Sequence, residues 1–265
     1  MLIKIGNFDF TEVWDGVLYK KLSAYPQISD WEARTLIEFI DYENANGRNC
    51  TIECENVELL TIINEKIADR SYKNAPRPYK ITECTACRHK GCLTDYVCHT
   101  TSVENAVSIL NCGSILSAVR ARNLPAEVLM KEKRNAAKDP ADYFDYVMFS
   151  WGNCQAGDRL VMERKLGRFP DQQDLSEGFQ PGVRFYFRYD ELIKHPDAVF
   201  DGVLPLKIRD EVLLADWVDK IVIPMRLRNS IIPHIPEKLE NKVIFIENDC
   251  KDIWEWSEKV YNIIK

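Results

Sequence analysis

The sequence predicts an α+β fold, because many short apolar segments typical of strands are separated by only a few helical patterns. A second observation is length, since 265 residues suit either one large domain or a catalytic domain with a smaller extension. A third is composition. With 46% hydrophobic and 29% charged residues, the chain resembles ordinary globular proteins and can bury a sizeable core.

The first 80 residues predict an accessory α/β region. Ser29 is placed to cap a helix, and apolar residues recur at helical spacing from 31 to 40 until Asn46-Gly47 ends the pattern. Residues 50–54 predict a short strand, and residues 57–67 a second helix. The Pro-containing run at 74–78 breaks the pattern as a linker would. We therefore expect an accessory region over 1–80 and a catalytic domain over 81–265.

The second region predicts further strands with helices between them. Residues 96–98 predict a strand, and Ser102 is placed to cap a helix that ends at Cys112-Gly113. A polar, basic helix is expected over 129–138, and an amphipathic helix over 253–264. The remaining expected strands cover residues 146–149, 183–187, 211–214, 220–223 and 242–246.

The charge balance excludes a strongly basic nucleic-acid-binding protein. The net charge is −6, so nucleic-acid binding would require a local basic cleft on an acidic whole. The N-terminus lacks the apolar run of a signal peptide, and no stretch of about 18 apolar residues predicts a membrane span. Nine cysteines without secretory context predict reduced thiols. We therefore expect a cytoplasmic protein that does not contact a membrane.

A cysteine-rich segment precedes the first strand of the second region. Cys84 and Cys87 form a C-x-x-C pair, and Cys92 follows closely. Zinc takes four nitrogen or sulfur ligands, of which such a pair supplies two. The next cysteine, Cys98, lies in an expected strand and would point away from the face that carries His99. Two interpretations stay open, a small zinc knuckle or a loop of reduced cysteines, and the poor second half of the motif favours the loop.

Three segments carry the candidate chemistry. The first is Tyr-Val-Cys-His-Thr-Thr at 96–101, followed by a helix and by Gly-Ser-Ile-Leu at 113–116. The second runs from 142 to 150 and contains Asp-Tyr-Val-Met-Phe. The third runs from 210 to 224, where Glu-Val-Leu leads through a short turn into an Ile-rich strand.

In this order the segments resemble ADP-ribosyltransferase domains. A strand with His-x-Thr, a helix ending in Ile-Leu and a Gly-x-Ile-Leu-Ser run are most similar to the opening of DarT-type toxins, which attach ADP-ribose to nucleic-acid bases. A basic Lys-x-x-Arg segment before the Asp-Tyr-Val-x-Phe strand is also similar. The resemblance covers residues 95–224. Residues 1–94, 151–154 and 158–180 depart from the family pattern.

The resemblance implies a split β-sheet core with flanking helices and NAD as the substrate that donates ADP-ribose. It further implies DNA or RNA as the acceptor, and a role as a toxin or phage-defence effector with an antitoxin partner. We expect the acceptor to be single-stranded, because a base stacked in a duplex cannot reach a buried ribose carbon. Two alternatives stay open. The same enzyme class can modify protein side chains, which the acidic net charge slightly favours, or the chain is a binding module with a degenerate transferase fold.

Glu211 is the candidate catalytic acid. Breaking the bond between nicotinamide and ribose develops positive charge on the sugar, which an adjacent carboxylate stabilises. Glu211 can also act as a base toward the attacking group. Without the resemblance, Glu211 beside Arg209 and Asp210 would be interpreted as an exposed charge at the end of a strand.

Several other residues are expected to contact NAD. His99 carries a donor and an acceptor nitrogen that suit a ribose diol, although a satisfied core histidine is the more common case. Thr101 either holds the same ribose or caps the following helix with Ser102. One aromatic ring of the second segment is expected to stack on nicotinamide, although rings in such a strand usually belong to the core. The candidates are Tyr143, Tyr146 and Phe149.

Basic residues between the motif strands are candidates for phosphate binding. Arg134 is expected to act in catalysis, by pairing with the NAD pyrophosphate or by orienting the acceptor, and Arg120 and Arg122 compete for the pyrophosphate. The whole cluster either lines the rim of a cleft and binds nucleic acid, or is a solvated helix face. Its members are Arg120, Arg122, Lys131, Lys133, Arg134 and Lys138.

Overall fold

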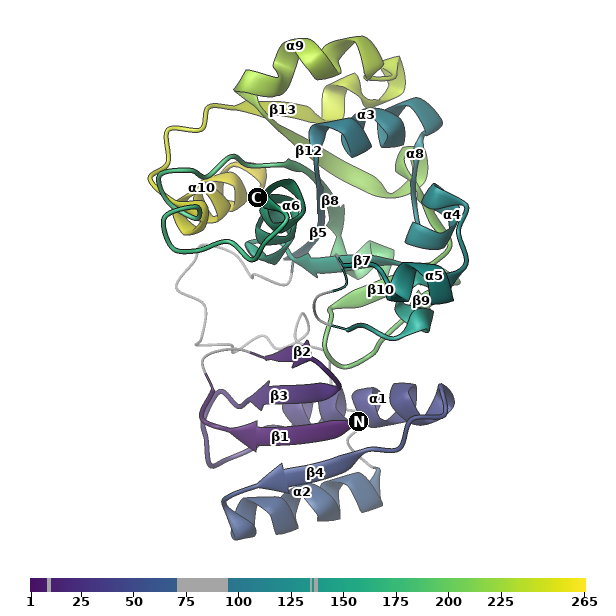
Figure 1. Cartoon of the computed structure of the whole chain (residues 1–265), viewed down its shortest axis with the longest axis vertical. Helices are drawn as coiled ribbons and strands as arrows, with labels where there is room; N and C mark the ends of the chain where they lie inside the picture. The colour runs from purple at the N-terminus through teal and green to yellow at the C-terminus, as the bar shows by residue number, and fades with distance from the viewer. Residues whose placement is uncertain (9–10, 71–94, 134, 136–137) are drawn as a thin grey trace.

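The computed structural model describes residues 1–8, 11–70, 95–133, 135 and 138–265, and its class is α+β as expected (Figure 1). The strands are β1 (Leu2–Gly6), β2 (Glu12–Trp14), β3 (Val17–Lys21), β4 (Thr51–Cys54), β5 (Tyr96–Thr101), β6 (Ser114–Leu116), β7 (Tyr146–Trp151), β8 (Val183–Arg188), β9 (Ala198–Val199), β10 (Leu206–Arg209), β11 (Glu211–Leu213), β12 (Val218–Pro224) and β13 (Val243–Ile246).

The α-helices are α1 (Asp30–Ala45), α2 (Val57–Asp69), α3 (Val103–Cys112), α4 (Ala118–Arg122), α5 (Ala126–Met130), α6 (Ala156–Leu166), α7 (Tyr189–Leu192), α8 (Leu214–Trp217), α9 (Arg228–Ile231) and α10 (Ile253–Ile264). Short 3-10 helices are η4 (Ala141–Asp145), η5 (Met225–Leu227), η6 (Ile232–His234) and η7 (Glu237–Lys242). Within the described residues, no helix is long and apolar enough to cross a membrane.

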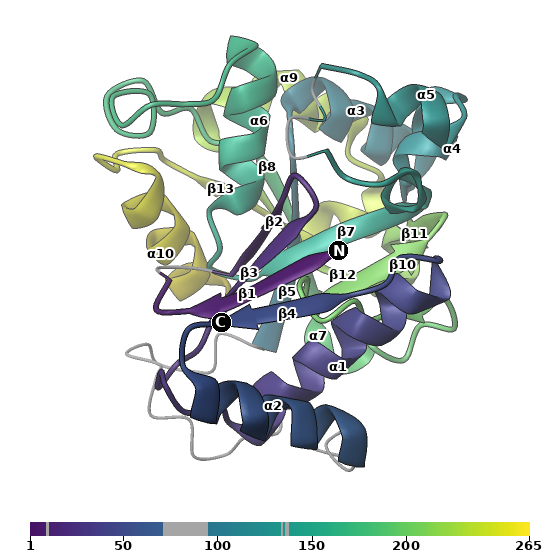
Figure 2. The same ribbon diagram turned by 60° about the horizontal axis from the view of Figure 1, so that its bottom comes forward.

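The N-terminal region forms a four-stranded sheet of order β2-β3-β1-β4 with helices α1 and α2, and it lies at one end of the molecule (Figures 1 and 2). Strand β1 is parallel to both β3 and β4, whereas β2 is antiparallel to β3. Alternate residues of the strands and one stripe of each helix bury a separate hydrophobic core. Its fully buried members include Ile3, Leu18, Leu36, Phe39 and Ile63.

The expected elements of this region are confirmed. Ser29 is the N-cap of α1 in a capping box with Glu32, and Asn46 ends the helix. The strand expected at 50–54 is β4, and the helix expected at 57–67 is α2. The β2–β3 hairpin was not expected. Its turn, Asp15-Gly16, has positive φ at both residues, the two-residue turn that Asp-Gly favours.

The main sheet has seven strands in the order β13-β12-β8-β5-β7-β10-β9, and all neighbours are antiparallel except β12 and β13. Helix α10 covers one face, where Trp256 and Tyr261 pack with Cys98 and Tyr186. The opposite face packs against α3 and contains Phe149 and other rings. The chain thereby surrounds one large sheet with helices on both faces (Figure 1).

The basic helix expected over 129–138 is wrong. Helix α5 ends at Met130, and residues 131–133 form turns. The side chain of Asn135 donates to the backbone carbonyls of Met130 and Asp139, at 2.9 Å each, and accepts from the Asp139 amide. Such side-chain bonds to the backbone compete with helical hydrogen bonding. Lys138 moreover has a left-handed backbone with φ of 58°.

The two regions contact each other through a buried lysine. Lys207 on β10 is fully buried, and its Nζ lies 3.7 Å from the ring centroid of Tyr42 on α1 and 4.0 Å from that of Tyr143. The Tyr146 ring lies 4.8 Å away, and Asp201 Oδ2 lies 3.1 Å away. Burial lowers the pKa of Lys207, while Asp201 opposes this shift. The cation is therefore held by three rings and one carboxylate.

Three further contacts join the regions. Arg48 donates to Asp142 at 2.8 Å, and the Tyr42 hydroxyl donates to the same carboxylate. Gly202 follows Asp201 with φ of 72°, and a Cβ there would lie 1.9 Å from the carbonyl oxygen of Thr35. Only glycine allows the 201–207 segment to approach α1 this closely.

Candidate active site

The main sheet divides where β5 leaves β7. Strand β5 pairs with β8 along its whole length, from Tyr96 to Thr101. It pairs with β7 only at Val97 and Cys98, opposite Trp151 and Ser150. From His99 onward β5 follows β8, while residues 146–149 of β7 pair with β10. The two strands therefore form a fork, and His99 stands where it opens.

His99 is oriented by the fork itself. Its Nδ1 lies 3.1 Å from the carbonyl oxygen of Met148 on β7. Because a carbonyl only accepts, Nδ1 carries the proton in this hydrogen bond, and Nε2 is left as an acceptor. The ring also meets Phe149 edge to face, at 6.3 Å between centroids. Cys98, next in the strand, points to the opposite face and packs with Tyr186, as the alternation of a strand predicts.

Burial lowers the pKa of His99, the Met148 carbonyl opposes the shift, and the charge of Arg164 on α6 adds to it. The pKa of His99 is therefore lower in the folded protein than in the unfolded chain. Below about pH 6.5 the unfolded chain binds more protons at this site, so stability falls as the pH falls.

We expect the free energy of unfolding of the His99→Asn variant to fall less than that of the wild type when the pH is lowered from about 7 to about 5.5, because the variant has no imidazole to protonate. Urea titrations at both pH values measure this, and equal losses would contradict it.

Glu211 lies beyond the end of the same fork. Strand β10 ends at Arg209, which faces Tyr146 at the start of β7, and the chain turns at Asp210 with φ of 64°. The Asp210 amide donates to the Asp145 carbonyl at 2.9 Å. Glu211 then begins β11, which pairs with β6 in a separate two-stranded sheet. The carboxylate is thus carried by backbone that is anchored on both sides.

Arg120 on α4 forms an ion pair with Glu211. Its Nη1 lies 2.6 Å from Glu211 Oε2, and both side chains remain well exposed. The sequence predicted Arg120 as a contact to NAD, and the structure places it beside the candidate catalytic acid. An exposed ion pair contributes at most about 1 kcal/mol, so a ligand can replace either partner at small cost.

The three aromatic candidates are all buried. The Tyr143 ring lies against the ammonium group of Lys207. The Phe149 ring packs edge to face on Phe187, with 5.2 Å between the ring centroids. The Tyr146 hydroxyl accepts a hydrogen bond from Arg209 at 2.8 Å. None presents a free ring face in this structure. Nicotinamide stacking on one of them stays a prediction that requires a ring to become uncovered.

Other expected residues are placed as follows. Thr101 is buried, and the cap of α3 is Ser102, whose side chain accepts from the Asn105 amide at 3.4 Å. Arg134, Cys84, Cys87 and Cys92 lie outside the described residues. Cys98 is a core residue that packs with Tyr186 and Trp256, and burial raises the pKa of its thiol to about 12. Elsewhere in the described chain, no three His, Cys, Asp or Glu side chains gather as metal ligands.

Two members of the basic cluster expected at a rim are paired with carboxylates. Arg122 pairs with Glu132 at 2.6 Å, and Lys138 pairs with Asp15 at 2.8 Å. Of the expected members that the structure describes, only Lys133 lines the cleft described next.

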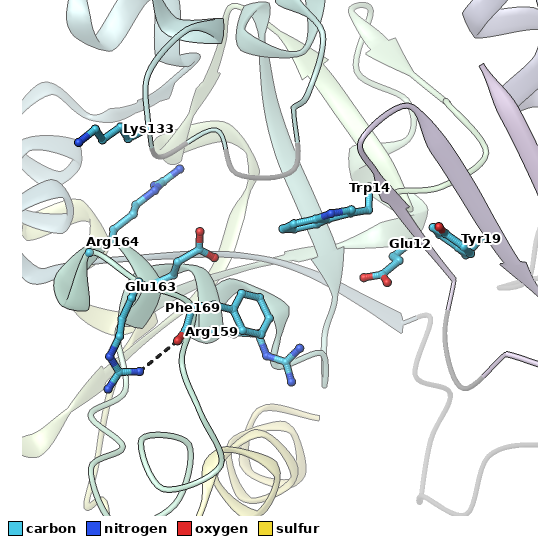
Figure 3. A pocket seen from close by; sticks show the side chains of 10 residues that line it. Glu12, Trp14, Tyr19, Lys133, Arg159, Glu163, Arg164 and Phe169 are labelled. Atoms are coloured by element: carbon cyan, nitrogen blue, oxygen red, sulfur yellow. Dashed lines mark hydrogen bonds between the residues drawn. The ribbon is translucent and has the colours of Figure 1, made fainter.

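A cleft of about 990 Å³ separates the β2–β3 hairpin from helix α6 and the residues after it (Figure 3). The sequence did not predict this cleft, because its walls come from the two regions of the chain. The Asp15-Gly16 turn, which places Trp14 at the tip of a hairpin, was the available signal. The lining residues are Glu12, Trp14, Tyr19, Lys133, Arg159, Glu163, Arg164, Gly167, Arg168 and Phe169.

Helix α6 is fixed to the main sheet by a buried ion pair. Asp158, in its first turn, accepts from Arg184 Nε at 2.8 Å and from the Gly182 amide at 3.0 Å. Arg184 on β8 also donates to Ser257 of α10 at 2.6 Å, and both charged side chains are fully buried. Arg184 faces Thr100 across the β5–β8 ladder, next to His99. The same anchor therefore holds α6, one side of the cleft and the strand that carries His99.

Comparison with known protein families, with curated proteins and with solved structures gives no match for this chain.

Proposed function

We propose that the protein is an NAD-dependent mono-ADP-ribosyltransferase that modifies a base in single-stranded nucleic acid. The observation that carries the proposal is the fork between β5 and β7. The neutral imidazole of His99 is held in a fixed orientation where the fork opens, and the carboxylate of Glu211 is on β11, the strand that follows β10. A sheet that divides at the histidine agrees with the split core implied by the resemblance.

The chemistry follows from the charge that develops on the sugar. The bond between the nicotinamide nitrogen and ribose C1′ breaks, and both electrons leave with nicotinamide. Glu211 stabilises the positive charge left on the ribose and accepts a hydrogen bond from a ribose hydroxyl. A ring or exocyclic nitrogen of the acceptor base then forms the new bond to C1′, and the proton that it loses passes to Glu211 or to solvent.

The ion pair between Arg120 and Glu211 fits this role. The Arg120 side chain can move from the carboxylate to a phosphate of NAD when the dinucleotide binds. His99 contributes before the bond breaks. Its Nδ1 is held by Met148, so Nε2 accepts a hydrogen bond from the ribose in the ground state.

We therefore expect His99→Ala to weaken NAD binding more than it slows the chemical step, because its contact is made in the bound ground state. Calorimetric titration with NAD and single-turnover kinetics separate the two effects. His195→Ala is the matched control, since it also removes a largely buried imidazole but one that lies outside strand β5 and packs on Trp217. Unchanged NAD affinity together with a collapsed rate would show that His99 acts in the reaction itself.

The test of the function is transfer of label. The pure protein is incubated with NAD carrying a labelled adenylate and, separately, with single-stranded DNA, with RNA and with a protein pool. Label on nucleic acid supports the proposal. Label on protein alone would show that the acceptor is a protein and not a nucleic acid. If NAD is not consumed in any pool, the enzyme class is contradicted.

A further inference from the structure

We propose that the cleft between the β2–β3 hairpin and α6 is the binding site for the single-stranded nucleic acid acceptor. Arginine and lysine side chains on the α6 side would hold the sugar-phosphate backbone, and exposed aromatic rings would stack on the bases. The inference rests on the proposed function for the acceptor and on the geometry of the cleft for its location.

The cleft gathers positive charge on an acidic protein. Four cations line it, namely Lys133, Arg159, Arg164 and Arg168, against the two carboxylates Glu12 and Glu163. The chain as a whole carries −6. A local excess of cations of this kind attracts a polyanion despite the overall charge.

The four cations differ in whether they already have an ion-pair or hydrogen-bond partner in the protein. Arg168 pairs with Asp174 at 2.6 Å. Among the described residues, neither Arg164 nor Lys133 has a carboxylate within ion-pair distance, and the buried Nε of Arg159 has no hydrogen-bond partner. Desolvation by the surrounding protein lowers the pKa of Arg164, whose side chain is nevertheless exposed in the cleft. A phosphate oxygen would satisfy these donors, since guanidinium groups match phosphate geometry.

Aromatic side chains stand on both sides of the cleft. Trp14 is 41% exposed and Phe169 is 56% exposed, although large rings are usually buried. Figure 3 shows Trp14 extending from the hairpin toward the side that carries Phe169 and Arg164. Exposed rings interleaved with cations are the arrangement by which proteins hold single strands, with bases stacked and phosphates paired.

The position of the cleft suits an acceptor. The charge of Arg164 contributes to lowering the pKa of His99, so the cleft and the fork lie within electrostatic reach of each other. A volume of about 990 Å³ lies at the upper end of the roughly 300–1,000 Å³ typical of small-molecule sites. A base held here would have to be unpaired to reach the ribose, because stacking in a duplex shields it.

The experiment measures binding of a fluorescein-labelled single-stranded oligonucleotide to the full chain, without NAD, by fluorescence anisotropy. Trp14→Ala should weaken binding about five- to a hundredfold through lost stacking. Arg164→Ala and Lys133→Ala should each lower the slope of log affinity against log salt by about 0.7. Matched controls are Trp254→Ala, which removes an equally exposed indole on α10, and Lys238→Ala on η7, and neither should change binding.

The NAD affinity of the same variants distinguishes whether the cleft binds the phosphates of a nucleic acid or those of NAD. If Trp14→Ala leaves NAD affinity unchanged and weakens the oligonucleotide, the cleft is the acceptor site. If NAD affinity falls, alone or together with that of the oligonucleotide, the assignment of a separate acceptor site is overturned. Absence of oligonucleotide binding in the wild type also overturns it, while NAD turnover in that protein would still leave the enzyme class intact.

Discussion

Replacing Glu211 by Gln is expected to lower the rate of ADP-ribosyl transfer by about 10²–10³ while the fold and NAD affinity stay close to those of the wild type. The amide keeps the shape of the side chain but cannot stabilise positive charge on the ribose. Glu211 is partly exposed, and among the described residues its ion-pair partner is Arg120, so the fold loses little. Single-turnover release of nicotinamide from saturating NAD measures the effect.

The neighbouring Asp210 offers a matched control. Asp210→Asn removes a negative charge one residue away, and asparagine tolerates the left-handed backbone found there. This variant should retain near-normal transfer. If Glu211→Gln also turned over normally, Glu211 would not be a catalytic carboxylate. If both variants lost activity equally, the rate would depend on net charge at this turn.

Removal of the buried carboxylate of Asp158 is expected to destabilise the protein by about 3–5 kcal/mol, because Asp158→Ala leaves the fully buried guanidinium of Arg184 without its counter-charge. The Gly182 amide also loses its acceptor. Urea denaturation followed by circular dichroism measures the free energy of unfolding.

Two comparisons frame that result. Lys194→Ala removes one partner of an exposed pair with Glu191 and should cost less than about 1 kcal/mol. The double variant Asp158→Ala/Arg184→Leu should recover part of the loss, since no charge is then stranded. A cost for Asp158→Ala no larger than that for Lys194→Ala would show that water reaches Arg184 and that the pair does not anchor α6.

Elements with strong local signals could be predicted from the sequence. Helix α10 has the bounds expected from its periodic apolar residues, and α1 and α3 begin after the expected caps Ser29 and Ser102. Short or weakly patterned elements could not. Helix α6 has little amphipathic character, because both its faces carry charges, and the end of α5 depends on side-chain bonds of Asn135.

For the candidate active site, the sequence supplied residue types but not their arrangement. His99 and Glu211 were identified by motif, and their positions at the two ends of one fork depend on the turn at Asp210. The cleft could not be predicted, because Trp14 and Arg164 are far apart in the chain and meet only when the two regions pack. The sequence also did not predict that two members of the expected basic cluster, Arg122 and Lys138, pair with Glu132 and Asp15.

The lysine held by three tyrosine rings bears on how the chain can be divided. A fragment starting at residue 81 would keep Lys207, Asp201 and Tyr143 but lose the Tyr42 ring, which lies nearest to the ammonium group. It would also uncover the backbone at Gly202 that fits against α1. Cutting the chain at the boundary expected near residue 80 would therefore remove contacts that the second region needs. Melting of the N-terminal region would expose a charge in the sheet of its neighbour, so we expect the two regions to unfold cooperatively.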